Sequence, residues 1–366
     1  MVDRPEGTPV VSVVLPTYDR ARTLERAVRS VLDQEFADLE LVVVDDGSTD
    51  GTPALLERID DPRLVVVRLG RNQGGNRARN CGIATARGEI VCFLDSDDAY
   101  LPGKVGAVVE HFRAHPSVDV LVDSFEKVRF RDGRVVRRKV RRNPDLVDRD
   151  DFRERVFDRR LFKATPALSV RRRALLAVGG FDETLRRRQD MDLLLRLAER
   201  HRCSSTGAVL WTKHWTDDAI SSTRDTYVDA TLDLCARHPD YAAVPRFRSG
   251  LARDLARHLG RLARGGRLSA LAADTWKLGR HFGARDLGRL LRLGRRELRE
   301  RREAAGQGAR ELADEQHREV AVGDQQRGRD LPERQLHLAP LPDHPLRRAT
   351  ELLPPERERT ADPAEA

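Results

Sequence analysis

The sequence predicts an α/β fold, with a mostly parallel sheet flanked by helices and a helical extension at the C-terminal end. Apolar segments of strand length alternate with helical patterns over the first 125 residues. The strand-like segments are nearly continuous runs of Val, Ile and Leu, which is typical of parallel strands covered on both faces. The chain has 366 residues, enough for about two domains of ordinary size.

Four strands and three helices are expected in this first part of the chain. The expected strands are 10–15, 39–44, 64–67 and 90–94. The expected helices between them are 24–32, 52–56 and 78–86. The second helix begins with Thr52 and Pro53, which suit the N-cap and first-turn positions. In open sheets of this kind the ligand binds beyond the carboxyl ends of the strands, so the segments that follow the strands should form the site.

Acidic side chains follow these strands. Asp46 comes after the second strand, and Asp95 and Asp97 come after the fourth. Carboxylates gathered at one sheet edge repel one another unless a cation or hydrogen-bond donors compensate them. A single aspartate also forms turns and N-caps, and for Asp98 alone that interpretation is favoured. Asp95 and Asp97, one residue apart in a D-x-D pattern, instead favour a site for Mg²⁺ or Mn²⁺, which take carboxylate oxygens.

The segment Pro16-Thr17-Tyr18 and the carboxylate of Asp46 suggest the rest of a nucleotide pocket. The ring of Tyr18 would present a face to a base, and Asp46 would accept a hydrogen bond from a base N–H group. For Tyr18, a half-buried packing role is equally compatible with the sequence.

Five ordered motifs resemble those of glycosyltransferase family 2. They are VSVVLPTYDR at 11–20, VDDGSTD at 44–50, ARNCGI at 78–83 with GEI at 88–90, FLDSDD at 93–98, and GGFDE at 179–183 with QDMDL at 189–193. The resemblance covers about residues 10–221. It implies a GT-A fold, a divalent metal ion and a nucleotide-sugar donor, for which a UDP-sugar is the expectation.

The matching motifs also imply roles for individual residues. The nucleoside would be held by Pro16, Thr17, Tyr18 and Asp46. Asp95 would contact the ribose side, with Ser96 beside it, and Asp97 would bind the metal ion that bridges the diphosphate. Asp190 would be the catalytic base. Gln189 stands where the family commonly has Glu, which removes one negative charge beside that base.

Two more segments are assigned to the phosphate and metal region. The run at 211–221 resembles the family's closing region, in which His214 would reach the metal ion and Lys213 a phosphate. A packed or capping role is equally compatible with a histidine between two tryptophans. Arg79, which follows a Gly-Gly turn, is a candidate phosphate contact.

These assignments imply a metal-dependent, inverting glycosyltransferase. Asp190 would relieve the acceptor hydroxyl of its proton in a single direct displacement, while the metal ion stabilises the leaving diphosphate. The sequence has neither an apolar stretch of membrane-spanning length nor a Q-x-x-R-W motif, which disfavours a processive membrane-embedded synthase. We expect the transfer of one sugar to a glycan or lipid-linked acceptor in cell-envelope or exopolysaccharide assembly. A polyprenyl-phosphate glycosyltransferase is the alternative.

Charge and composition divide the chain into a GT-A domain at 1–222, a basic helical extension at 223–302 and a tail at 303–366 that is expected to be disordered. Residues 246–302 carry 17 Lys and Arg against 5 Asp and Glu, with leucines at helical spacing. These helices are expected to pack on the catalytic domain with an arginine-rich outer face. Peripheral docking of 246–302 on an anionic membrane is the alternative, and the two can coexist.

Other function classes are disfavoured. A G-x-G-x-x-G dinucleotide motif does not follow the first strand. The net charge of +8 makes a basic nucleic-acid-binding protein the alternative from another class, yet the basic helices lack interleaved aromatic residues, so no nucleic-acid partner is expected. The chain start lacks an apolar signal segment and the four cysteines form no C-x-x-C pair. We therefore expect reduced thiols and a cytoplasmic protein, peripheral at the inner face of the cell membrane if the extension docks there.

Overall fold

The computed structural model describes residues 7–131, 134–158, 160–215, 227–296 and 299–300. The tail at 303–366, for which disorder was expected, lies outside the described residues. No helix of the described part is long and apolar enough to cross a membrane. The four cysteines are free thiols, as expected from their spacing.

The first half of the sheet consists of four parallel strands in the order β3-β2-β1-β4. These strands are β1 (Val11–Thr17), β2 (Leu39–Asp45), β3 (Leu64–Arg68) and β4 (Ile90–Phe93). The helices between them are α1 (Leu24–Leu32), α2 (Thr52–Glu57) and α3 (Gly75–Thr85). Every element predicted for this region is confirmed.

The apolar pattern that predicted α1 also packs this helix against the core. Leu24, Ala27, Val28 and Val31 lie on one side of the helix, because residues three and four apart share a face, and all four are fully buried. In β1 and β2 every residue is buried, as expected for central parallel strands covered on both faces.

The second half of the sheet is mixed. Its strands are β5 (Ala99–Tyr100), β6 (Val120–Arg131), β7 (Arg134–Arg141), β8 (Leu168–Arg171) and β9 (Cys203–Trp215). β8 runs antiparallel to both β4 and β6, whereas β6 and β9 are parallel. β7 pairs antiparallel with β6, outside the main strand order. The α/β fold is thus confirmed, and the four strands that were predicted from apolar runs form the all-parallel half of the sheet.

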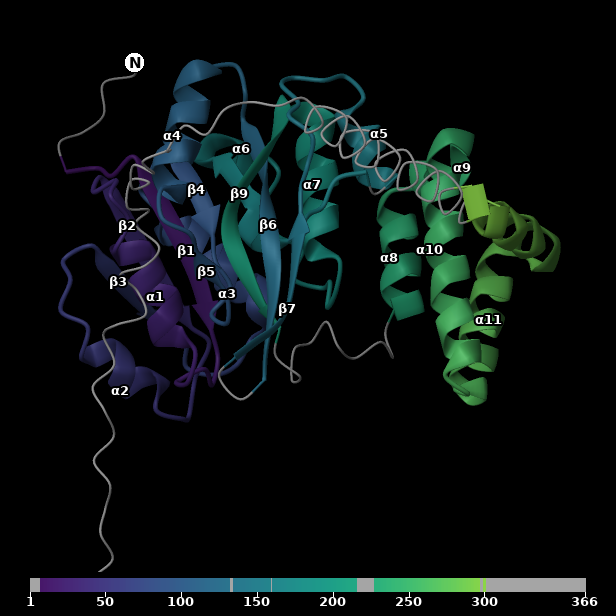
Figure 1. Cartoon of the computed structure of the whole chain (residues 1–366), viewed down its shortest axis with the longest axis horizontal. Coiled ribbons are helices and arrows are strands. Elements are labelled where there is room, and N and C mark those ends of the chain that lie inside the picture. Colours follow the sequence, from purple (N-terminus) through teal and green to yellow (C-terminus); the bar gives the residue numbers. More distant parts are fainter. Residues whose placement is uncertain (1–6, 132–133, 159, 216–226, 297–298, 301–366) are drawn as a thin grey trace, which may run out of the picture. The chain divides into compact units, whose positions relative to one another are not determined.

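In the second half of the chain, some helices cover this sheet and others follow it toward the C-terminal end of the described residues (Figure 1). They are α4 (Lys104–Ala114), α5 (Phe152–Phe157), the 3₁₀ turn at Thr165–Ala167, α6 (Arg172–Ala177) and α7 (Gln189–Arg200). The C-terminal helices are α8 (Tyr227–Arg237), α9 (Asp240–Ala243), α10 (Pro245–Arg264) and α11 (Leu268–Phe282). α10 packs on α5, α9 and α11, and its leucines Leu251, Leu255, Leu259 and Leu262 join the main hydrophobic core.

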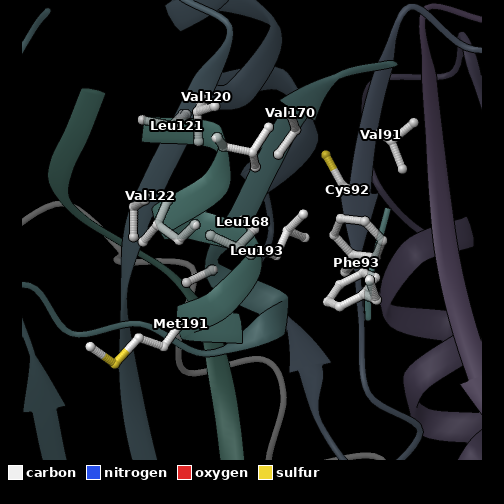
Figure 2. Packing of buried hydrophobic residues seen from close by; sticks show 14 of the residues in the cluster. Val91, Cys92, Phe93, Val120, Leu121, Val122, Leu168, Val170, Met191 and Leu193 are labelled. Atoms are coloured by element: carbon white, nitrogen blue, oxygen red, sulfur yellow. The ribbon is translucent and has the colours of Figure 1, made fainter. Parts of the chain in front are cut away.

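The core links the sheet to α7, the helix that carries the predicted base. Figure 2 shows Phe93 of β4, Leu168 of β8 and Val122 of β6 in one cluster with Met191 and Leu193 of α7. Because protein interiors are close-packed, this cluster holds the N-terminal end of α7 in a defined position relative to the strand ends.

Candidate active site

A cleft with a volume of about 1030 Å³ lies where β1, β2 and β4 end. Nine of the predicted site residues line it: Pro16, Thr17, Tyr18, Asp46, Arg79, Asp95, Ser96, Asp97 and Asp190. Among its described lining residues His214 does not appear. Asp97 and Asp190, which are 93 positions apart in the sequence, therefore share one cleft.

The turn after β1 presents two kinds of surface to the cleft. Tyr18 is 42% exposed, so a face of its ring is accessible. Thr17 is buried, and within the described part of the chain its hydroxyl has no hydrogen-bond partner. A buried hydroxyl without a partner is costly, and a ligand in the cleft would satisfy it.

Asp46 anchors the neighbouring loop. Its two carboxylate oxygens accept hydrogen bonds from the backbone N–H groups of Gln73 and Gly74, each at 2.8 Å. Gly47 follows with a φ of +78°, and a Cβ there would lie 2.7 Å from the backbone of Arg71, so only glycine fits. Asp46 thus shapes the cleft wall as well as lining it, a structural role that its motif did not reveal.

Arg79 is paired with a carboxylate of the D-x-D pattern. Its Nη2 donates to Asp95 Oδ1 at 2.8 Å, and its guanidinium lies over the ring of Phe181, 5.6 Å from the centroid. Both side chains are largely buried, which strengthens the pairing relative to a surface ion pair. The structure therefore places Arg79 beside Asp95, where it compensates that negative charge.

Asp97 and Asp98 are the carboxylates of the site whose charged forms are disfavoured. Burial, and then the nearby charge of Asp95, raise the pKa of Asp97. Burial raises the pKa of Asp98 well above its usual value, although its Oδ1 accepts the backbone N–H of His214 at 2.9 Å. Both shifts mean that negative charge at this edge is incompletely compensated by the protein.

Lys213 is a second compensating cation that lines the cleft. Its Nζ lies 3.9 Å from Asp98 Oδ2. Burial alone would lower the pKa of Lys213, yet surrounding carboxylates outweigh burial and raise it. These carboxylates are, in order of effect, Asp98, Asp95, Asp97 and Asp190. The lysine therefore stays charged at neutral pH and lies among the acidic residues that follow β4 and the predicted base Asp190.

The carboxylate oxygens of the cleft fit a divalent cation whose remaining coordination positions would be filled by a bound ligand. Carboxylate oxygens are the ligands that Mg²⁺ and Mn²⁺ prefer, and the raised pKa of Asp97 indicates a place where positive charge would be favourable. Within the described residues no group of three or more His, Cys, Asp or Glu side chains is arranged to hold a metal ion. An ion held by one or two carboxylates would need further oxygens, which the phosphates of a substrate commonly supply.

His214 belongs to strand β9 of the sheet. Its ring stacks on Phe130, with centroids 5.5 Å apart. Burial, and then the charge of Arg26, lower the pKa of His214 to about 4, so the imidazole is neutral at neutral pH. Its Nδ1 is buried without a hydrogen-bond partner in the described part of the chain. The ligand role of His214 stays a prediction, and the packing role that the sequence also allowed is visible in the stacked ring.

Asp190 lies in the first turn of α7 and faces the cleft. Its Oδ1 accepts the backbone N–H of Met191 at 2.8 Å. Arg188, just before the helix, has a φ of +63°, a left-handed conformation that is unusual for a side-chain-bearing residue. Contacts with α8 hold it there, because its guanidinium lies over the ring of Tyr227 and donates to the hydroxyl of Thr231 at 2.8 Å. The predicted base therefore depends on α8 for its position.

Asp192 connects the same helix to α8. It is 1% exposed and accepts hydrogen bonds from Arg196 at 2.7 and 2.9 Å. It also shares a 3.0 Å hydrogen bond with His238, which follows α8 directly. The bond to Arg196 lies within α7, so His238 is the partner that links this carboxylate, and with it the first turn of α7, to the end of α8.

A cationic wall of the cleft was missed by the sequence reasoning. It consists of Arg186, Arg187 and Arg188 before α7 and of Arg257 and Arg261 on α10, with the carboxylate of Asp254 among them. Arg257 and Arg261 are one helical turn apart, so they share a face. The helical periodicity of α10 was the available signal, but it predicted an outward-facing arginine surface. The structure turns part of that surface into the cleft.

Comparison with known proteins identifies the first part of the chain. The model of glycosyl transferase family 2 matches residues 12–178. The succinoglycan biosynthesis protein ExoO of Rhizobium meliloti (strain 1021) is 42% identical over 132 residues, which are 36% of this chain and 37% of that protein. The GalNAc(5)-diNAcBac-PP-undecaprenol beta-1,3-glucosyltransferase of Campylobacter jejuni is 38% identical over 105 residues, or 28% of this chain and 34% of that protein. This chain thus spans about a third of the length of these relatives.

A solved structure extends the likeness in fold. TarS 1–349 of S. aureus, in complex with UDP-GlcNAc, has a TM-score of 0.55 at 23% identity and covers 68% of this chain and 72% of that one. At this identity the likeness concerns the fold alone. The predicted GT-A fold and the predicted family resemblance are both confirmed, and the resemblance to glycosyl transferase family 2 extends over residues 12–178.

Proposed function

We propose that this chain, with its glycosyl transferase family 2 domain, moves a single sugar from a nucleoside-diphosphate sugar to a hydroxyl acceptor in cell-envelope glycan assembly. One observation carries the proposal: the carboxylates of Asp97 and Asp190 line the same cleft. A transferase needs a metal-binding acid for the donor and a base for the acceptor within reach of each other. The relatives that match this domain are named for glycan biosynthesis, which supports the same setting.

The donor half of the cleft lies between β1, β2 and β4. The accessible ring of Tyr18 would stack on a base, and the unpartnered hydroxyl of Thr17 would bond to the nucleoside. UDP-GlcNAc is bound by TarS, whose fold is similar, and a UDP-sugar is the donor we propose here.

The transfer is proposed as a single displacement. The oxygen of the acceptor hydroxyl bonds to the anomeric carbon while its proton passes to the Asp190 carboxylate. The bond from that carbon to the diphosphate breaks, and its electron pair leaves with the diphosphate oxygen, so the anomeric centre is inverted. A Mg²⁺ or Mn²⁺ ion held by Asp97, with Asp95, would stabilise the charge on this leaving group. Lys213 stays protonated among the carboxylates and holds positive charge on the same side of the cleft.

The acceptor half is proposed to take an anionic molecule. Arg186, Arg257 and Arg261 line the cleft near the end that carries Asp190, and guanidinium groups suit phosphate oxygens. Arg257 is the one of these with a nearby acid, Asp254 at 3.6 Å, among the described residues. A diphosphate-linked lipid is named as the acceptor of the Campylobacter jejuni relative, and a phosphate-bearing acceptor of that chemistry fits this wall. A polyprenyl phosphate would fit it as well.

The proposal is tested by a hydrolysis screen of nucleotide sugars with Mn²⁺, because many transferases slowly transfer the sugar to water. We expect one UDP-sugar to be cleaved and the cleavage to stop with a chelator. Asp190→Asn should lower transfer by about 10²- to 10⁴-fold while donor binding stays the same. The matched control is Asp233→Asn on the exposed side of α8, which should change nothing. Equal loss of donor binding in Asp190→Asn would contradict the assignment of the base.

A further inference from the structure

β7 is an edge strand with an unusual composition. Its eight residues, RVVRRKVR, include five cations and three valines and no acidic residue. Arg141 is half-buried and the other seven residues are exposed. β7 lies beside β6 (Figure 1), and within the described residues no other strand pairs with it. A flank of this sheet therefore displays a dense row of positive charge.

The register of the hairpin sets like charges against each other. Lys127 of β6 lies directly opposite Lys139 of β7, and Arg129 lies opposite Arg137. Residues directly opposite in antiparallel strands are close neighbours on the same face, and like charges there are destabilising. Burial, and then the charges of Lys213 and Arg141, lower the pKa of Lys127, which reflects the same crowding. This arrangement costs stability, so the fold alone does not account for it.

Few acidic side chains of the described residues neutralise the positive charge of β7. Arg138 pairs with Glu126 at 3.3 Å. Arg134, Arg137 and Lys139 form no ion pair with any residue in the described part of the chain. Such a surface is electrostatically complementary to a partner that carries many negative charges.

A ladder of lysines connects this surface to the cleft. Lys213 of β9, Lys127 of β6 and Lys139 of β7 occupy the same register position on three neighbouring strands. Lys213 lines the cleft, and Lys139 lies at the outer edge of the sheet. Positive charge is thus continuous from the acidic end of the cleft to β7.

Apolar side chains are mixed with these cations. Phe130 is 44% exposed, and Val135, directly opposite it, is 49% exposed. Val136 and Val140 are exposed to 53% and 45%. The register of the hairpin shifts between Arg129 and Phe130, which leaves Val136 without a partner in the ladder at a β-bulge. Cations together with accessible apolar groups are the combination that binds the interface of a membrane with anionic lipids.

Two other roles for this surface, protection against aggregation and binding of nucleic acid, explain fewer of its features than membrane binding does. Charged residues on an edge strand prevent aggregation, but that role does not require cations opposite cations or exposed valines beside them. Single-stranded nucleic acid binding relies on aromatic stacking platforms, and the described side chains of β7 are Arg, Lys and Val. In the alternative membrane surface at 246–302, the leucines of α10 are buried in the core, whereas Leu268 and Trp276 of α11 are exposed, so the test below includes a control on these helices.

We propose that the β6–β7 hairpin, with the cations and valines of β7 and Phe130 of β6, docks the protein on a membrane surface that contains anionic phospholipids. The lysine ladder then brings the cleft to the level of the lipid headgroups. Docking itself does not depend on the proposed transfer reaction. Its consequence for that reaction is that a lipid-linked acceptor would reach the cleft from the membrane plane.

The test is co-sedimentation of the full chain with vesicles. We expect binding to vesicles rich in phosphatidylglycerol, weakened by salt, and little binding to phosphatidylcholine alone. Arg137→Ser combined with Lys139→Ser should weaken binding about 30-fold, since each cation near an anionic surface contributes about 1 kcal/mol. The same variant should keep or raise the thermal stability, because it removes one member of each like-charge pair. Val135→Ser combined with Val136→Ser should also weaken binding, and this loss should persist at high salt.

A charge-matched control separates this surface from the C-terminal helices. Arg264→Ser combined with Arg285→Ser removes two exposed cations from the helical extension and should leave vesicle binding nearly unchanged. The proposal is overturned if the control loses binding and the hairpin variant keeps it. It is also overturned if the intact protein binds duplex DNA more tightly than anionic vesicles at the same salt concentration. Hydrolysis of the donor by the hairpin variant should equal that of the intact protein, so a failed donor screen and a failed docking test remain distinguishable.

Discussion

Replacing Asp192 by Asn should destabilise the protein by about 3 kcal/mol. The side chain is 1% exposed and receives two hydrogen bonds from Arg196 and one from His238. Hydrogen bonds to a charged group contribute about 1.5 to 3 kcal/mol each, and the amide of Asn keeps one oxygen to accept them. Both Arg196 bonds end on Oδ2, so the amide oxygen can keep them, but without the charge they are about half as strong, and the bond to His238 at Oδ1 is lost. These losses together give about 3 to 6 kcal/mol. The lower end applies because Arg196 is partly exposed and remains bonded to the carbonyls of Val178 and Gly180.

The pH dependence of this loss has a definite sign. Burial alone would raise the pKa of Asp192, yet the hydrogen bonds from His238 and Arg196 outweigh it and hold the pKa below its usual value. A carboxyl group whose pKa is lowered by folding adds stability above its unfolded pKa of about 4 and loses that contribution as the pH falls through its folded pKa. The difference between the intact protein and Asp192→Asn should therefore be largest near neutral pH and shrink below about pH 4.

The assay is urea unfolding of the full chain at neutral and acidic pH, with Asp233→Asn as the control for loss of one exposed acid. A second readout is the Michaelis constant for the acceptor, since Asp192 joins α7, which carries Asp190, to the end of α8. A destabilisation below about 1 kcal/mol, or one that is equal at both pH values, would refute the reasoning that this carboxylate is a charged structural link.

Two further predictions concern the close contact of a glycine with the central strand and the cationic wall of the cleft. Gly82→Ala should lower stability by about 1 to 3 kcal/mol in thermal unfolding, because its Cβ would lie 2.3 Å from Cγ1 of Val14 in the central strand, and Gly106→Ala, with open space around its Cβ, is the control. Arg257→Ser combined with Arg261→Ser should raise the Michaelis constant for a phosphate-bearing acceptor by about tenfold or more, since each charge-assisted hydrogen bond contributes about 1.5 kcal/mol or more. Donor hydrolysis should stay unchanged, and an equal loss of donor cleavage would place these arginines on the donor instead.

The first part of the fold was predictable because its signals are local. In β1 and β2 a nearly continuous apolar run marks a strand that is covered on both faces, and each strand is followed by the residues of its motif. The topology then brings Thr17, Asp46 and Asp97 to one edge without further information, since parallel strands end on the same side.

The hairpin strand β7 and the cationic wall of the cleft could not be predicted because their sequence signals are ambiguous. β7 has neither an apolar run nor alternation, and its pairing with β6 is decided by tertiary contacts rather than by its own sequence. The periodicity of α10 defines its buried leucines, but a helix has several polar faces and the pattern does not say which neighbour meets each one. Arg257 and Arg261 thus appear the same as Arg264 in the sequence, although only the first two line the cleft.

The distribution of charge in the cleft supports the divalent ion that we propose beside Asp97. Arg79 lies 2.8 Å from Asp95, and Lys213 lies 3.9 Å from Asp98. Asp97 also faces the charge of Asp95, and its pKa is raised by burial and by that charge. A diphosphate entering the cleft would add negative charge beside these carboxylates, which is unfavourable unless further positive charge enters with it. Lys213 and Arg20 compensate Asp97 only in part, because its pKa stays raised, so the divalent ion proposed to arrive with the donor would restore the balance there.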